Sequence, residues 1–132
     1  MNQPTSLGKH VNGTTGSDPT VQIRKATPGE SVRDGFERRI IHTDHLMAVV
    51  IDIENGPWKQ ADPPHTHPHE QITYVVSGDI LFLCERLSPV RLTAGDLYAI
   101  PPNLPHSIQL FSKTARLVDC FTPLRVDFLD KQ

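Results

Sequence analysis

The sequence predicts an all-β domain, arranged as a sandwich or barrel of short strands. The chain of 132 residues has the length of one domain and is long enough to bury a core. Its 12 prolines and 8 glycines are numerous enough to end many short elements. Runs of β-branched and aromatic residues recur between these turn signals, and their close spacing is typical of all-β folds.

The N-terminal third predicts a flexible arm followed by strands. The arm is rich in Asn, Thr, Gly and Ser and has no hydrophobic period, which is typical of an unstructured segment. A Pro-Gly pair and an aspartate between two β-favouring runs indicate turns. The expected elements are an arm from Met1 to Asp18, strands from Val21 to Lys25, Phe36 to Thr43 and Leu46 to Ile53, a turn from Thr27 to Glu30 and a bend at Asp44. Residues 19–132 are expected to form one domain with a C-terminal tail.

The middle of the chain predicts a loop and a hairpin. Asn55-Gly56-Pro57 ends the preceding strand, and two adjacent prolines keep the following segment out of a sheet. A long β-favouring run then stops at a glycine, and a second apolar run returns antiparallel to it. The expected elements are a loop from Trp58 to Pro64, a strand from His65 to Ser77, a turn at Gly78-Asp79 and a strand from Ile80 to Cys84.

The last third predicts four more strands and a short helical turn. Ser88-Pro89 and Ala94-Gly95-Asp96 separate the first two strands, and the proline-rich segment 101–105 stiffens the loop before the third. The third and fourth strands form a hairpin through Ser112-Lys113. The expected elements are strands from Val90 to Thr93, Leu97 to Ile100, His106 to Leu110 and Ala115 to Phe121, and a helical turn from Val126 to Asp130.

Charge and composition exclude several classes of partner. The formal net charge is -2 and basic residues do not cluster, so nucleic acid is not expected as a partner. No apolar run approaches the length of a membrane span, and Met1 to Asp18 lacks the basic start and apolar run of a signal peptide, so the expected location is the cytoplasm. Cys84 and Cys120 lie in apolar runs without the spacing of a zinc pair, and we expect them to be buried free thiols.

A histidine cluster before the long strand predicts a metal site. His65, His67 and Gln71 have the same parity, so on an extended strand they point to one side. Imidazole nitrogens suit divalent transition metals. A solvated surface loop is the alternative reading of such a cluster. His69 has the same parity but follows Pro68, so we expect it at the rim or around the ligands, and Glu70 is a further alternative ligand.

The opposite face of the same strand predicts a second subunit. Ile72, Tyr74 and Val76 alternate with the residues of the metal side and form an apolar outer face. Such a face needs to be covered by the N-terminal strands or by a partner. We expect a homodimer packed sheet against sheet.

Two motifs resemble those of the cupins. His65-Thr66-His67, three residues, Gln71, six residues and Gly78 match the first cupin motif, and Gly95 through His106 match the second. Asn103 replaces the usual glycine, and Leu110 stands where an asparagine is usual. The resemblance implies a β-barrel with jelly-roll topology and one divalent metal ion, Fe, Ni, Zn, Mn, Co or Cu, bound by His65, His67, Gln71 and His106.

The glutamine at position 71 departs from the glutamate of many cupins. Three imidazoles and an amide are neutral, so the charge of the metal is not compensated by its ligands. Such a site is a strong Lewis acid that attracts a small anionic substrate. It lacks the carboxylate of the facial triad in non-haem iron oxygenases, which weakens the dioxygenase reading.

The C-terminal segment resembles the ending of one cupin subgroup. Residues 119–129 match the pattern D-x-F-x-P-x-R-x-D-[FY]-L, which accompanies the Pro68-His69-Glu70-Gln71 motif in a subgroup that includes a pectin-degradation protein that linearises unsaturated galacturonate. The resemblance implies catalytic roles for Asp119, as general acid or base, and for Arg125, as a clamp for a substrate carboxylate. Phe121, Tyr98 and Trp58 are expected to contact the substrate. The structural alternatives are a core Phe121, an Arg125 paired with Asp127 or Asp130, and a Trp58 packed in its loop.

The sequence is compatible with three functions. The first is a non-redox metalloenzyme, of lyase or isomerase type, acting on a sugar acid or keto sugar. The second is a metal-dependent dioxygenase, which needs a redox metal. The third is a module that binds a metabolite without catalysis.

Overall fold

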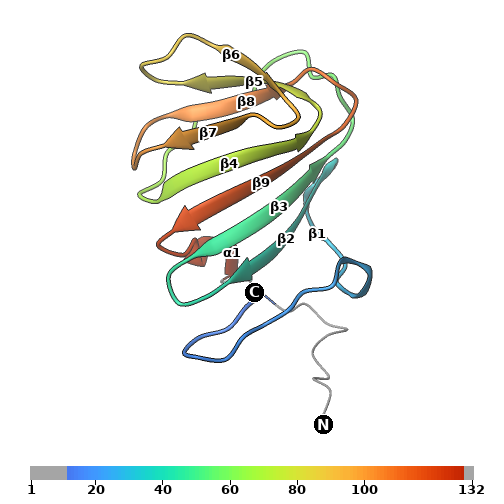
Figure 1. The fold of residues 1–132 in the computed structure, drawn as a ribbon. Helices are drawn as coiled ribbons and strands as arrows, with labels where there is room; N and C mark the ends of the chain where they lie inside the picture. Colours follow the sequence, from blue (N-terminus) through green and yellow to red (C-terminus); the bar gives the residue numbers. More distant parts are fainter. Residues whose placement is uncertain (1–11, 130–132) are drawn as a thin grey trace.

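The computed structural model describes residues 12–129 and shows a nearly all-β chain (Figure 1). Within these residues, two short helical segments lie outside the strands. The elements are η2 (Arg24–Ala26), β1 (Glu30–Arg33), β2 (Phe36–His42), β3 (Met47–Ile53), β4 (Glu70–Ser77), β5 (Asp79–Cys84), β6 (Val90–Thr93), β7 (Leu97–Ile100), β8 (His106–Leu110), β9 (Ala115–Thr122) and α1 (Val126–Leu129).

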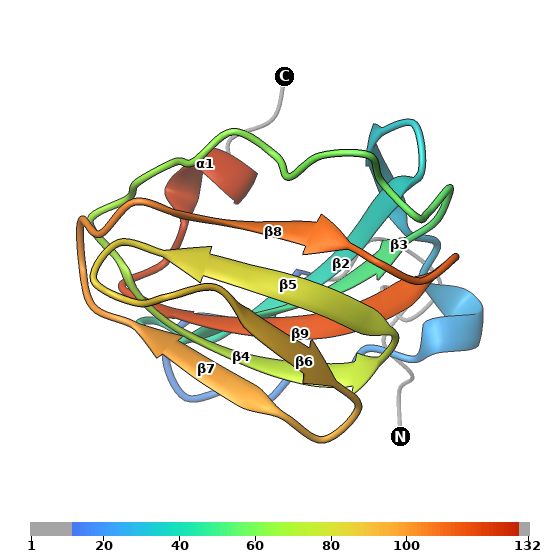
Figure 2. The same cartoon turned by 90° about the horizontal axis from the view of Figure 1, so that it is seen from above.

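The strands form two antiparallel sheets that face each other. The larger sheet has the order β1-β2-β3-β9-β4-β7 and the smaller has the order β6-β5-β8. Figure 2 shows β5, β6 and β8 as one layer over the larger sheet, with α1 at one end. Residues 12–129 form no closed ring of paired strands, so the described fold is a two-sheet sandwich, and the expected closed barrel is not seen.

Alternating side chains build the core between the sheets. Along β9 every second residue is buried, and β4 alternates in the same way through most of its length. This period of two is what a sheet with one covered face produces. The fully buried aliphatic residues come from both sheets: Met47, Val49, Ile53, Val75, Ile80, Ile100 and Leu110.

The region before β2 differs from the prediction. The expected strand from Val21 to Lys25 is wrong, because the chain closes a 3-10 turn in which the N–H groups of Ala26 and Thr27 bind the carbonyls of Ile23 and Arg24. The next segment, Glu30–Arg33, forms β1 at the edge of the larger sheet, where a strand needs few apolar residues.

Part of the predicted arm lies outside the described residues, which begin at residue 12. Within the described part, Gly13 forms a parallel bridge with His42, and the Thr14 N–H donates to the His42 carbonyl at 3.0 Å.

The predicted histidine strand begins later than expected. Regular pairing starts at Glu70, and His65 takes part only in an isolated bridge to His106. Pro68, which has no N–H to donate, interrupts the ladder between them. From β2 onwards the other predicted strands agree with the structure to within one residue at each end.

The outer face of the larger sheet exposes apolar side chains, as the alternation predicts. Ile72 is 54% exposed, Tyr74 43% and Leu97 60%. Tyr74 and Leu97 are direct cross-strand partners on β4 and β7, so the exposed carbon is continuous across the two strands. Among the helices of the described residues, none has the length and apolar character needed to cross a bilayer.

Candidate metal centre

Three histidines converge between the sheets. Ligand nitrogens of His65, His67 and His106 all lie within 4.8 Å of one another, and the last two side chains are buried. The backbones of His65 and His106 exchange two hydrogen bonds, of 3.0 and 3.1 Å. The Asn103 N–H donates to the His67 carbonyl at 2.8 Å, and Asn103 adopts a φ of 69°, which asparagine tolerates well. These hydrogen bonds fix the proline-rich loop of residues 101–105 to the histidine segment.

The contacts of His67 fit a bound cation. Its Nδ1 lies 3.1 Å from the His69 carbonyl and its Nε2 lies 2.9 Å from Gln71 Oε1, so both ring nitrogens face oxygen acceptors. A neutral imidazole has one N–H and satisfies only one of them. When Nδ1 donates to His69, the lone pairs of Nε2 and of the Gln71 amide oxygen face each other. A metal ion is an acceptor of both lone pairs.

His106 presents the same arrangement in a simpler form. Its Nδ1 donates to the Leu104 carbonyl at 2.7 Å, which leaves Nε2 as the lone-pair nitrogen. That Nε2 is buried and has no hydrogen-bond partner among residues 12–129. Metal-bound histidines commonly donate their second ring nitrogen to a carbonyl in this manner. The donor set therefore fits a transition metal ion.

The surroundings keep the three imidazoles neutral. His65 retains exposed surface, but the partial burial of its ring, and then the neighbouring His106 and His67, lower the pKa of this ring to about 4. Burial also lowers the pKa of His67 and of His106. At neutral pH each ring therefore offers a free lone pair, which is the form that binds metal.

A chain of hydrogen bonds connects the metal side to a buried acid. Gln71 Nε2 donates to Thr73 Oγ1 at 2.9 Å, and Thr73 Oγ1 donates to Asp119 Oδ1 at 2.5 Å. Burial raises the pKa of Asp119 to about 6, although the Thr73 hydrogen bond and the Arg125 charge lower it. A carboxyl group with such a pKa can exchange a proton near neutral pH.

Arg125 lines the cavity and is held in place by its neighbours. Its Nε and Nη2 bind the two carboxylate oxygens of Asp127 at 3.1 and 2.8 Å, so the pairing expected as a structural alternative is present. The guanidinium also lies over two rings, 4.1 Å from the centroid of Phe128 and 5.0 Å from that of Phe121. The side chain is only 12% exposed.

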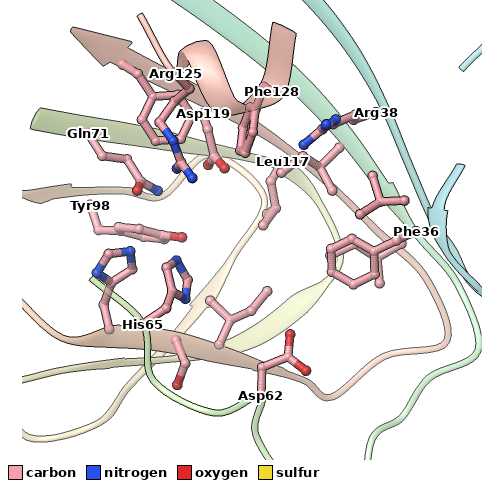
Figure 3. Close-up of a pocket in the computed structure, with 17 residues that line it drawn as sticks. Phe36, Arg38, Asp62, His65, Gln71, Tyr98, Leu117, Asp119, Arg125 and Phe128 are labelled. Carbon is pink, nitrogen blue, oxygen red and sulfur yellow. The ribbon is translucent and has the colours of Figure 1, made fainter. Parts of the chain in front are cut away.

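These groups surround one cavity of about 280 Å³, which suits a small metabolite. Figure 3 shows Gln71, Tyr98 and His65 at one end, with Arg125 and Asp119 beside them. His106 lines the same end. The cavity continues past Leu117 to Phe36 and Arg38 at the opposite end.

The aromatic residues expected at the substrate have three different positions. Tyr98 lines the cavity and stacks on Phe82 at 3.9 Å, and burial raises its pKa. Phe121 lines the cavity and meets the His67 ring edge to face at 5.6 Å. Trp58 lies outside the lining, where it stacks on Phe36 of β2 at 5.9 Å and packs against the hydrophobic core.

The two residues named as alternatives in the histidine segment are not among the three converging histidines. The buried His69 ring lies beside the cluster, 5.5 Å from the His67 ring and 6.3 Å from the Phe121 ring, and its carbonyl orients His67. Glu70 is exposed. Among the residues of the site that were not singled out from the sequence are Thr73, Arg38 and Phe128. For Thr73 a signal existed, because it has the parity of Gln71 on the same strand.

Comparison with known proteins agrees with this arrangement. The family model described as the cupin domain matches residues 56–121 of this chain. The pectin degradation protein KdgF of Dickeya dadantii is 35% identical over 109 residues, covering 81% of this chain and 96% of KdgF. The dimethylsulfoniopropionate lyase DddQ of Ruegeria pomeroyi is 32% identical over 71 residues, covering 54% of this chain and 34% of DddQ.

Solved structures give the same result. The structure of KdgF from Halomonas sp. superimposes with a TM-score of 0.72 at 31% identity, covering 80% of this chain and 96% of that one. An RmlC-like cupin from Shewanella frigidimarina gives 0.74 at 29% identity, with coverages of 84% and 96%. Both motifs, the three converging histidines and these likenesses lead to one conclusion: the chain belongs to the cupin domain family.

Proposed function

We propose that this cupin is a metalloenzyme that acts on a small anionic metabolite by Lewis-acid and general acid/base chemistry. One observation carries the proposal: a cluster of neutral metal-ligating side chains shares a cavity with a buried carboxyl group, Asp119, and a cation, Arg125. The similarity to KdgF, described as a pectin degradation protein, supports an enzyme and makes sugar acids the first candidates.

The ligands of the ion are His65, His67, Gln71 and His106 in this proposal. All four are neutral donors, which suit Fe, Ni, Zn, Mn, Co or Cu in the divalent state. When bound, the ion supplies a Lewis acid that polarises an oxygen of the substrate. His106 Nε2 supports this assignment because it is buried and has no hydrogen-bond partner among residues 12–129, and His67 Nε2 and Gln71 Oε1 support it in the tautomer in which His67 Nδ1 donates to the His69 carbonyl.

The other residues of the site transfer a proton or orient the substrate. Asp119 holds or releases a proton at its carboxylate, and the Thr73 hydroxyl fixes the rotamer of that carboxylate. Arg125 orients an anionic group through Nη1, since Nε and Nη2 bind Asp127. The Phe121 and Tyr98 rings exclude water from the reacting end.

The outer face of the larger sheet supports a homodimer. Ile72, Tyr74 and Leu97 present continuous exposed carbon, and a second copy of the same face would cover it. We also propose a jelly-roll topology for the single domain of residues 19–132, as in other cupins. Light scattering of the wild-type protein and of a Leu97→Lys variant tests the dimer: a monomeric wild type contradicts it.

Metal content and turnover test the proposed function. Protein purified without a metal-affinity tag should contain about one transition metal ion per chain, and His106→Ala should lose most of it. Asp119→Asn should keep the metal and lose turnover, measured as loss of the ultraviolet absorbance of an unsaturated uronate or related acid. His45→Ala, at an exposed histidine, is the matched control. Full metal content in His106→Ala, or full turnover in Asp119→Asn, would contradict the proposal.

A further inference from the structure

Arg38 lines the cavity and has no role in the proposed chemistry. On β2 it has the parity of Phe36, so both side chains enter the space between the sheets. Ile51 on β3 is its cross-strand partner, and Leu117 on β9 is the next residue in the same row. Asp119 follows Leu117 by two residues on the same face of the sheet. Arg38 is therefore separated from the reacting end by two strands and by one step along the sheet.

The guanidinium of Arg38 is buried and only partly paired. The side chain is 11% exposed, and Nε donates to Glu30 Oε1 at 3.0 Å. Among residues 12–129, no acceptor is within hydrogen-bond distance of Nη1 or Nη2. Figure 3 shows this guanidinium directed toward Phe128 and Leu117, on the side of the cavity away from Gln71. The two terminal nitrogens form a planar fork whose N–H groups match the two oxygens of a carboxylate.

Two arginines share one aromatic ring at the cavity. The guanidinium carbons of Arg38 and Arg125 each lie 4.1 Å from the centroid of the Phe128 ring, so their separation is at most twice that distance. Each guanidinium is held by one carboxylate, that of Glu30 or of Asp127. In the described part of the chain, Arg125 retains Nη1, and Arg38 retains both Nη1 and Nη2. The cavity therefore offers two cationic donor groups within reach of one small molecule.

The other polar groups of this end leave the fork of Arg38 open. Asp62 accepts two hydrogen bonds from Arg33 Nη2, at 2.9 and 3.2 Å, so its charge is balanced by a residue outside the lining. Figure 3 shows Asp62 on the opposite side of the cavity from Arg38. Ser107 is buried in the lining, and its hydroxyl can donate to a ligand oxygen. A second acid group at this end of the cavity would thus find donors in Arg38 and Ser107.

We propose that Arg38 is a second anchor, which binds a distal carboxylate through Nη1 and Nη2, and that the substrate is a dicarboxylate. One acid group lies with Arg125 near the histidines, and the other lies with Arg38 beyond Leu117. This inference rests on the proposed function, because the first acid group is the anion that the site is proposed to bind. It narrows the substrate from small anions in general to dianions that are held at both ends.

Matched pairs of acids test the inference on the zinc-loaded full chain. Succinate, glutarate and adipate are compared by calorimetry with butanoate, pentanoate and hexanoate, so that each pair differs only in the second carboxylate. One diacid or more should bind at least about tenfold more tightly than its partner, because charge-assisted hydrogen bonds at Arg38 add to those at Arg125. The ω-hydroxy acid of the same length should bind more weakly than the diacid.

NMR shows where the second acid group lies. The tightest diacid should shift the Nε–Hε signals of both Arg38 and Arg125, whereas the monoacid of the same length should shift only that of Arg125. A diacid that leaves the Arg38 signal unchanged contradicts the second anchor.

Two substitutions on β2 localise the effect. Arg38→Met keeps an aliphatic chain against Phe128 but removes the fork, and it should abolish most of the advantage of the diacid. Arg39→Met removes a charge from the next residue, which has the opposite parity and does not line the cavity, and it should leave that advantage unchanged. Arg38→Lys keeps the charge without the fork and should retain only part of the advantage. If Arg38→Met does not fold, the acid pairs and the NMR signals of the unaltered chain decide.

The outcomes separate this inference from the proposed function. Equal affinity within every pair, on a chain that binds the monoacids, overturns the second anchor and leaves the metal-centre proposal intact. A diacid advantage that survives Arg38→Met overturns the assignment to Arg38, and an ω-hydroxy acid that binds as tightly as the diacid overturns the preference for a carboxylate. Failure of every acid to bind overturns the proposed anion site and this inference with it.

Discussion

Thr73 on β4 donates its hydroxyl hydrogen to Asp119 on β9, with the two oxygens 2.5 Å apart. The same hydroxyl accepts from the Gln71 amide, so one buried threonine connects a proposed metal ligand to the acid. Thr73 has no exposed surface. The orientation of Gln71 and the charge of Asp119 are therefore interdependent.

Replacing Thr73 by valine should impair proton transfer. Thr73→Val keeps the shape and removes the hydrogen bond that lowers the pKa of Asp119, so this pKa should rise above about 6. We expect kcat to fall at least tenfold and the acid limb of the pH–rate profile to move to higher pH. Thr73→Ser should restore both. A valine variant with the wild-type pH profile would contradict the positioning role.

Removing the charge of Asp119 should stabilise the fold. A carboxyl group whose pKa is about 6 when folded, against 3.8 when unfolded, destabilises the protein above pH 6. Asp119→Asn should therefore raise the free energy of unfolding at pH 7.5 by about 1–3 kcal/mol. Urea denaturation of the metal-free protein measures this difference. Asp52→Asn, which removes a half-exposed partner of Arg116, is the control and should give no gain.

The metal-free protein should lose stability as the pH falls from 7 towards 4. The folded-state pKa of His65 is lowered to about 4 and those of His67 and His106 are lowered as well, so the unfolded chain takes up protons first. Asp119 acts in the opposite direction, because its raised pKa gives the folded state a proton near pH 6.

We expect the histidines to dominate this balance, because three of them oppose a single acid. Urea midpoints at pH 7, 6 and 5 should therefore decrease steadily, and they should decrease less steeply in His65→Asn. Midpoints that rise on acidification would show that the burial of Asp119 dominates.

Arg125 should affect substrate binding more than metal binding. Arg125→Lys keeps a positive charge but loses the planar group that binds Asp127 and stacks on Phe128. We expect KM for an acid substrate to rise at least tenfold with metal content unchanged. Steady-state kinetics with elemental analysis measures both quantities. Loss of metal in this variant would assign Arg125 a structural role in the centre instead.

The sequence predicted the strands best where a run of alternating apolar and polar residues ends at a turn residue. From Phe36 onwards, β-branched runs end at Gly, Pro or Asp, and the structure confirms those strands closely. Val21 to Lys25 failed because local 3-10 hydrogen bonds compete with pairing for a short run that has no strand beside it. His65 lies outside the regular ladder because Pro68 interrupts it, although the bridge to His106 still brings the two rings together.

The contacts inside the site could not be predicted from the sequence, because they depend on which distant strands pair and in which register. Thr73 and Asp119 are 46 residues apart, and only the pairing of β4 with β9 places them opposite each other. Ile51 and Leu117, which both line the cavity, likewise meet only through the pairing of β3 with β9. Motif spacing predicted a ligand set but contained no information on which strands would be neighbours.

The three histidines differ in exposure, and this difference has a consequence for metal exchange. His67 and His106 are buried, whereas His65 is exposed. If these histidines hold an ion, as we propose, a chelator in solution reaches the centre first at His65. We therefore expect His65 to govern how fast the ion exchanges with solution and all the ligands together to set its affinity, so the exchange rate and the affinity can vary independently.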